Sequence, residues 1–136
     1  MSKHWFAPNV AYTMAKYGMS MCVLGMAEEF KPDKIGVNAL WPRTIISTAA
    51  VSMLMGDKSF EYARNEEIMA DAAYAILCKD PKLTTGNFFI DDDIVREAGV
   101  TDLTQYACVP ANADKLIPDG FIDNEDSTVD FVKSKL

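Results

Sequence analysis

Tyr12-Thr13-Met14-Ala15-Lys16 lies near the start of a run, residues 10–30, that contains no proline and is rich in Ala, Met, Leu and Glu. This composition predicts a long helix that is stopped by Pro32. Four-residue spacing places Tyr12 and Lys16 on one face of that helix, one turn apart. Because a nearby ammonium favours the phenolate form, the pattern predicts a proton-transfer pair. The alternative is an ordinary amphipathic pair on a packed helix.

Two short apolar runs follow this helix and predict buried parallel strands. Residues 35–41 end at Pro42, and residues 86–90 are bounded by Thr84-Thr85 and the triple Asp91-Asp92-Asp93. Between the two runs, residues 65–77 predict a second helix, with Asn65 as its cap. Helices that alternate with apolar strands indicate an α/β fold.

Three further expectations concern burial. The apolar residues of 10–30 lie all round the predicted helix, so we expect neighbours to cover it on two sides. Cys22, Cys78 and Cys108 are widely spaced and odd in number, and we expect reduced, mostly buried thiols. The acidic run Asp91-Asp92-Asp93 is expected to form a solvated strand end.

Composition excludes several classes of function. The chain has 136 residues, enough for one domain, and its formal net charge of -7 argues against nucleic acid and anionic membrane surfaces. No apolar run approaches the roughly 20 residues that span a bilayer. With one histidine and no paired cysteine spacing, no metal site is predicted.

The order of motifs resembles a known enzyme family. Tyr12-x-x-x-Lys16 on a helix precedes a strand that runs into Pro42, then a loop with Ile46-x-Thr48, a helix, and Thr85-Gly86-Asn87-Phe88. This order is similar to the C-terminal half of a classical short-chain dehydrogenase/reductase. The resemblance implies the C-terminal part of a Rossmann-type, doubly wound parallel sheet, an α/β fold, with the N-terminal glycine-rich half missing.

The resemblance also implies an activity and a set of site residues. The activity is hydride transfer between NAD or NADP and a carbonyl or alcohol carbon of a small, apolar, lipid-like substrate. Tyr12 would be the general acid/base, and Lys16 would lower its pKa and hold the nicotinamide ribose. The remaining cofactor contacts would come from Pro42, Ile46 and Thr48, and residues 51–64 would form a mobile lid. Members of the family associate, so a homo-oligomer is expected.

The chain departs from the family in ways that affect its activity. The glycine-rich turn that binds pyrophosphate has no counterpart in these residues, and Ser2 is not assigned the role of the family's catalytic serine. Arg43 stands where a glycine usually follows Pro42. We therefore expect residues 1–118 to be a partial dehydrogenase domain that binds no cofactor alone. The alternative function is a catalytically silent dimerisation or interaction module.

The last three residues match a targeting signal. Residues 119–136 are acidic and are expected to form a flexible tail. The tail ends in Ser134-Lys135-Leu136, a tripeptide that the peroxisomal import receptor reads at a free C-terminus. The sequence therefore predicts a peroxisomal protein, and the alternative is an accidental ending.

Overall fold

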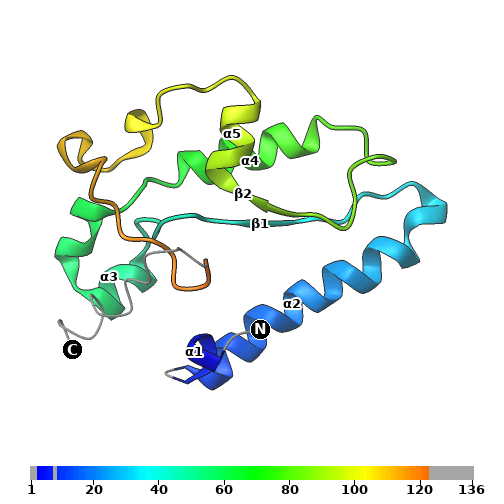
Figure 1. Cartoon of the computed structure of the whole chain (residues 1–136), viewed down its shortest axis with the longest axis horizontal. Coiled ribbons are helices and arrows are strands. Elements are labelled where there is room, and N and C mark those ends of the chain that lie inside the picture. Colours follow the sequence, from blue (N-terminus) through cyan, green and yellow to red (C-terminus); the bar gives the residue numbers. More distant parts are fainter. Residues whose placement is uncertain (1–2, 8, 123–136) are drawn as a thin grey trace.

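The fold is known from a computed structural model, which describes residues 3–7 and 9–122. One long helix, several short helices and two short strands follow one another along the chain (Figure 1). The helices are α1 (Lys3–Phe6), α2 (Val10–Glu29), α3 (Ala49–Met55), α4 (Glu67–Leu77) and α5 (Asp91–Glu97), and the strands are β1 (Ala39–Trp41) and β2 (Phe88–Ile90).

The two strands form a parallel sheet, as predicted. Ala39 pairs with Phe88, Leu40 with Phe89 and Trp41 with Ile90. The main chain pairs further upstream, because the amide of Gly86 donates to the carbonyl of Val37 at 2.7 Å. The connection from β1 to β2 contains α3 and α4, so the arrangement is the α/β crossover expected of a Rossmann-type sheet.

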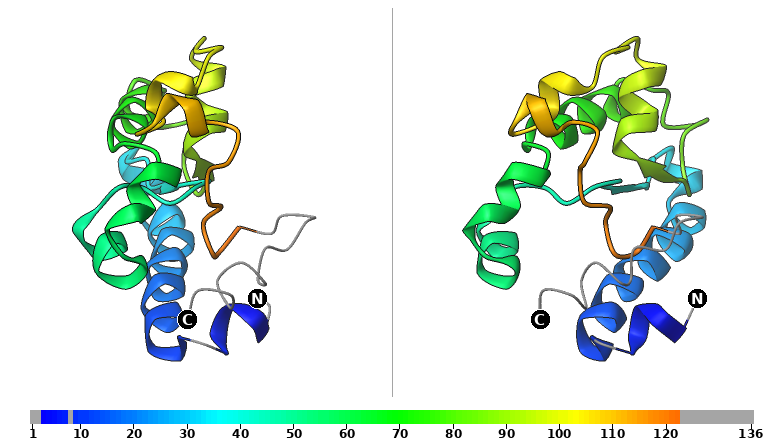
Figure 2. Two further views of the ribbon diagram at one scale, coloured as in Figure 1. Left: turned by 90° about the vertical axis from the view of Figure 1, so that its left-hand side faces the viewer. Right: turned by 60° about the vertical axis from the view of Figure 1, so that its left-hand side comes forward.

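Helices lie on both sides of this small sheet. α4 and α5 pack together on one face, while α2 runs along the other side of the molecule (Figures 1 and 2). The C-terminal turn of α2 approaches the chain before β2, where a Cβ built on Gly86 would lie 3.5 Å from the Cβ of Ala27. Gly86 has φ of 74°, a conformation that favours glycine.

The hydrophobic core lies between α4, α5 and the sheet. Ile68 and Ala72 of α4 are buried against Ile94 and Val95 of α5, and Leu40 and Phe89 of the strands pack on this cluster. Four-residue spacing on α4 places Ile68 and Ala72 on one face of this helix. The predicted cap is wrong by one residue, because Glu66 is the N-cap of α4. The main-chain amide of Asn65 instead donates to the carbonyl of Tyr106 at 2.8 Å.

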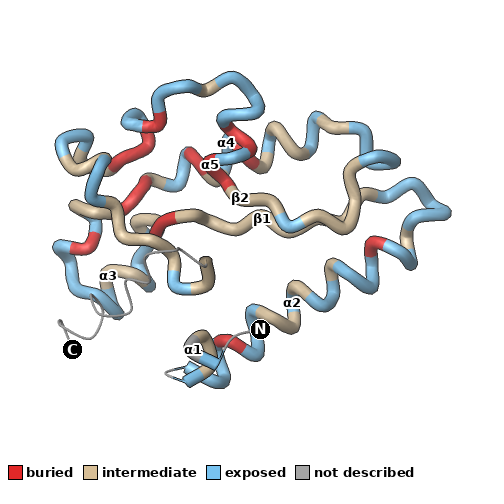
Figure 3. Tube along the Cα trace, viewed as in Figure 1, coloured by how far each residue is buried: buried red, intermediate tan, exposed pale blue. Residues whose placement is uncertain are grey.

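The expectation that α2 is covered on two sides is wrong for the described residues. Only Thr13 and Ala27 of this helix are buried, whereas Met14 is 62% exposed and Leu24 57% exposed (Figure 3). The apolar residues surround the helix, but the described part of the chain packs against one side of it. An apolar helix surface of this extent is typical of an interaction face.

The expected burial of the thiols is also wrong. Cys22 and Cys78 are exposed and Cys108 is partly buried. Cys22 lies on α2, whose side chains are mostly exposed, and Cys78 lies just beyond the last residue of α4.

Candidate active site

Tyr12 and Lys16 meet on one face of α2, as the spacing predicts. The Nζ atom of Lys16 lies over the ring of Tyr12, 5.3 Å from its centroid. This geometry is a cation–π contact, which keeps the positive charge beside the phenol. Between them, Thr13 is fully buried, and its hydroxyl donates to the carbonyl of Trp5 at 2.6 Å. The first turns of α2 are therefore anchored while Tyr12 stays 54% exposed.

Phe121 covers one side of the Tyr12 ring. The two ring centroids are 5.8 Å apart, and the planes are inclined by 25°. Phe121 belongs to the segment 117–122, which returns along the end of β1: the amide of Ile45 donates to the carbonyl of Ile117, and that of Asp119 to the carbonyl of Arg43, both at 2.9 Å. The sequence reasoning missed Phe121, because no local pattern indicates where this segment returns.

Asp119 lies in the same segment, and its carboxyl interacts electrostatically with the ammonium of Lys16. Burial raises the pKa of the Asp119 carboxyl, while the hydrogen bond from the amide of Phe121, at 3.0 Å, and the charge of Lys16 lower it. The net direction is upward. The carboxyl of Asp119 therefore lies within electrostatic range of Lys16.

An open apolar hollow adjoins Phe121. Its volume is about 270 Å³, and it is lined by Trp41, Phe88, Ile90, Phe121 and Ile122. The rings of Trp41 and Phe88 meet edge to face at 6.4 Å. Phe88 and Ile90 alternate with Phe89 along β2, so the hollow lies on one face of the sheet, and it reaches the carboxyl ends of both strands at Trp41 and Ile90. Open α/β folds bind their ligands outside these strand ends.

The predicted cofactor residues Pro42, Ile46 and Thr48 lie in the connection that leaves β1 at this same end. Ile46 forms a parallel bridge with Arg64, which closes the residues between them into a loop. Thr48 is the N-cap of α3, and its hydroxyl oxygen accepts a hydrogen bond of 3.3 Å from the amide of Val51. The structure thus brings Tyr12 and Lys16 into contact and holds the other three residues in a separate, well-bounded connection.

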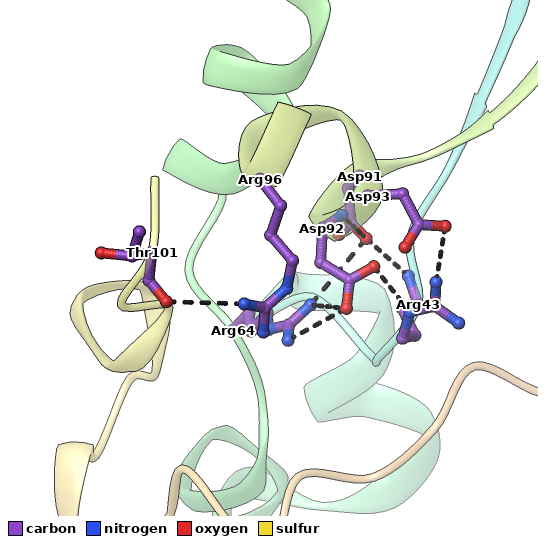
Figure 4. A network of polar contacts seen from close by, with 7 residues as sticks. All are labelled: Arg43, Arg64, Asp91, Asp92, Asp93, Arg96 and Thr101. Atoms are coloured by element: carbon purple, nitrogen blue, oxygen red, sulfur yellow. Dashed lines mark hydrogen bonds and ion pairs between the residues drawn. The ribbon is translucent and has the colours of Figure 1, made fainter. Parts of the chain in front are cut away.

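Next to Pro42, a network of charges joins the two strand ends (Figure 4). The Nε atom of Arg43 donates to Asp92 at 2.6 Å, and its Nη2 atom donates to Asp93 at 2.7 Å. The amide of Arg43 also donates to Asp91 at 2.9 Å. Arg64, which is itself buried, adds a second guanidinium 3.5 Å from Asp92.

The expectation of a solvated acidic strand end is therefore wrong for two of the three residues. Asp91 is fully buried and Asp92 is 6% exposed, while Asp93 is exposed. All three lie in the first turn of α5, where negative charge is favourable. Burial raises the pKa of Asp91, and the hydrogen bonds from Arg43 and Asp92 and the charge of Arg64 act against that rise.

The described residues contain neither a metal-binding group of side chains nor a helix that could span a membrane. Across residues 3–7 and 9–122, no group of three or more His, Cys, Asp or Glu side chains is placed to hold a metal ion. Within the same ranges, none of the helices has the length and apolar character that crossing a membrane requires.

Solved structures with this fold define the class. A crystal structure of a proposed dehydrogenase from Xanthomonas campestris superimposes with a TM-score of 0.83 at 44% identity, covering 91% of this chain and 44% of that one. A short-chain dehydrogenase from Mycobacterium thermoresistibile gives a TM-score of 0.78 at 44% identity over 91% of this chain and 43% of that one. The chain therefore has the fold of part of a Rossmann-type short-chain dehydrogenase, which confirms the predicted resemblance.

Within that class, the chain is similar to one particular protein, hydroxysteroid dehydrogenase-like protein 2. It is 54% identical to the protein from Bos taurus over 125 residues, which are 92% of this chain and 29% of that protein. It is also 54% identical to the protein from Homo sapiens over 119 residues, 88% of this chain and 28% of that one. The chain thus spans less than a third of the length of these relatives. No protein-family model matches it.

Proposed function

We propose that this chain provides the proton-transfer half of an NAD- or NADP-dependent oxidoreductase site. The observation that carries the proposal is the contact between Lys16 and Tyr12, 5.3 Å from Nζ to the ring centroid. Tyr12 also stacks on Phe121, which lines the hollow beside the last residues of both strands. Relatives named as dehydrogenases give independent support. The proposed substrate is a small apolar carbonyl or alcohol.

Tyr12 is proposed as the general acid and base. Its exposed phenol would donate a proton to the carbonyl oxygen during reduction and accept one from the alcohol during oxidation. The ammonium of Lys16 supports this role by its position, because it lies over the ring of the phenol that would transfer the proton. A bound nicotinamide would supply or accept the hydride.

The described residues fit one end of such a cofactor. Lys16 offers ammonium donors to ribose hydroxyls beside Tyr12, and Pro42, Ile46 and Thr48 belong to the connection proposed to border the nicotinamide. The 136 residues contain no glycine-rich turn of the type that binds pyrophosphate. Each ribose hydrogen bond contributes only about 0.5–1.5 kcal/mol net, which does not offset the entropy lost on association.

The apolar hollow supports the proposed substrate class. Its lining comes from aromatic and aliphatic side chains, and Phe121 joins it directly to the Tyr12 ring. An acyl or steroid-like group attached to the reacting carbonyl would bury apolar surface there. Each Å² of buried apolar surface contributes about 25 cal/mol to the free energy of binding. A role in lipid metabolism follows as part of the proposal.

Calorimetric titration with NAD and NADP tests the cofactor assignment. The 136-residue chain alone is expected to bind neither measurably, and co-expression with the glycine-rich half of a related dehydrogenase is expected to restore binding. Lys16→Met in the completed enzyme should weaken cofactor binding and turnover together, because one ammonium serves both. Micromolar binding by the chain alone would contradict the assignment.

A second candidate function is favoured by the exposed apolar surface of α2. Met14, Met19, Met21 and Leu24 are each more than half exposed, and side chains of this kind are enriched at protein interfaces. Under this alternative the chain is a catalytically silent module that dimerises or binds a partner. An inactive completed enzyme that still associates would favour it.

We also propose a peroxisomal location. The terminal Ser134-Lys135-Leu136 lies outside the described residues, so the support is the sequence alone. A fluorescent protein fused to the N-terminus of this chain should give spots that coincide with a peroxisomal marker. Deleting the three residues should leave it in the cytosol, and the same distribution for both fusions would refute the import-receptor proposal.

A further inference from the structure

Arg43 is the point at which three separate stretches of chain meet. Its side chain reaches the first turn of α5, where Nε contacts Asp92 at 2.6 Å and Nη2 contacts Asp93 at 2.7 Å. Its backbone amide donates to Asp91, and its carbonyl accepts the amide of Asp119. One residue therefore joins the end of β1, the start of α5 and the segment 117–122.

The joined segment leads directly to the candidate acid/base. Only one residue separates Asp119 from Phe121, and the Asp119 carboxylate accepts the Phe121 amide at 3.0 Å. Phe121 in turn stacks on Tyr12. A displacement of the Arg43 backbone would therefore move the ring that lies against the Tyr12 phenol.

The network around Arg43 is built to hold that backbone in one place. Asp92 is almost fully buried and receives Arg43 at 2.6 Å but Arg64 only at 3.5 Å, so Arg43 is its closer charged partner. The backbone amide of Arg43 also donates to Asp91, and this second contact remains when the side chain is shortened to Ala. Charge-assisted hydrogen bonds of this length are strong and directional.

We propose that Arg43 is a positioning residue, which fixes the end of β1 against α5 and thereby holds Phe121 on Tyr12. An effect of Arg43 on turnover rests on the proposed function of Tyr12. The role of Arg43 in holding Phe121 in place does not depend on that function. The hydrogen bonds of Arg43 go to α5 and to Asp119 rather than to Tyr12 or Lys16. Its effect on Tyr12 therefore passes through the backbone of segment 117–122.

Hydrogen exchange of the full 136-residue chain tests the structural part. Arg43→Ala should accelerate exchange of the Asp119 amide about tenfold relative to the Ala72 amide in the core of α4. Arg43→Lys, which keeps the charge but loses the forked geometry, should give a smaller acceleration. The control is Glu97→Gln, which removes the exposed ion pair with Lys79 at the other end of α5 and should leave the ratio unchanged.

The comparison with Ala72 makes the experiment decisive. Equal acceleration at Asp119 and Ala72 would show general destabilisation without positioning, and no acceleration would show that the side chain fixes nothing; either result overturns the proposal. In the completed enzyme, Arg43→Ala should lower kcat more than it raises KM, and Arg43→Lys should recover part of kcat. If the completed enzyme without substitutions is inactive, but Arg43→Ala still accelerates exchange at Asp119 more than at Ala72, the proposed function is refuted and the positioning role stands.

Discussion

The ring of Phe121 stacks on the ring of Tyr12, with centroids 5.8 Å apart, although the two residues lie near opposite ends of the described chain. The contact joins the long helix α2 to the segment that runs along the end of β1. It places a phenol, an ammonium and an apolar hollow next to one another, the arrangement on which the proposed proton-transfer role rests.

Replacing Phe121 by Ala should lower the free energy of unfolding by at least about 1 kcal/mol, because it removes the aromatic pair and also the apolar area that the ring buries. Urea denaturation measures the effect. Phe60→Ala is the control, because Phe60 is 47% exposed and its replacement should change stability by less than about 0.5 kcal/mol. Equal values for the two variants would show that the Tyr12–Phe121 contact does not stabilise the chain in solution.

Tyr106 should make stability depend on alkaline pH. Burial, together with its 2.6 Å hydrogen bond to Asp71 and that residue's charge, raises the pKa of Tyr106 from 10.0 to about 12. The folded state therefore holds the phenol proton more tightly than the unfolded state. This stabilisation is complete below pH 10 and is lost as pH rises towards about 12.

The test compares Tyr106→Phe with wild type by urea denaturation at several pH values. The variant should be about 1.5 kcal/mol less stable at neutral pH, because a hydrogen bond to a carboxylate is lost. The difference should shrink above pH 10. Tyr74→Phe is the control, since Tyr74 is 72% exposed. A difference that stays constant from neutral pH to about pH 12 would contradict the assignment.

The isolated chain should associate and be marginally stable. The sheet of the described residues has two strands, and α2 exposes a broad apolar surface, so bare edges and faces are available for pairing. Sedimentation velocity should show dimers or larger species, and the thermal midpoint should lie below about 60 °C.

A pair of variants separates the two exposed surfaces. Met21→Gln with Leu24→Gln on α2 should reduce association, whereas Met53→Gln with Leu54→Gln on α3 should reduce it less. Both pairs are exposed, but the α2 pair belongs to the longer apolar helix. A monomeric wild-type chain with a cooperative melt above about 60 °C would contradict the expectation.

Much of the fold could be predicted from local patterns. The predicted helix of residues 10–30 ends one residue earlier, at Glu29, because Pro32 stops it in any context. The strands are shorter than residues 35–41 and 86–90, since Asn38 interrupts the regular pairing: its side-chain amide donates to the carbonyl of Thr84 at 3.0 Å, and its side-chain oxygen accepts the amide of Asn87 at 3.1 Å. Local composition cannot show that a side chain will replace a strand contact.

The candidate site was only half predictable. Helical spacing decides that Tyr12 and Lys16 meet, so the five residues 12–16 suffice to predict that contact. The burial of Asp91 and Asp92 depends on guanidinium groups from Arg43 and Arg64, which lie far away in the sequence. The position of Phe121 likewise depends on where a distant segment returns. Contacts of this kind follow from tertiary packing, which no local pattern contains.

The most direct test of the central claim is the activity of a completed enzyme that carries Tyr12→Phe. Phenylalanine keeps the ring that stacks on Phe121 and lies under Lys16, but it removes the transferable proton. The rate of NAD- or NADP-dependent reduction of an apolar carbonyl should fall by about 10² to 10⁴, the loss typical of a missing general acid. Full activity in the Tyr12→Phe enzyme, with folding unchanged, would show that Tyr12 does not transfer the proton.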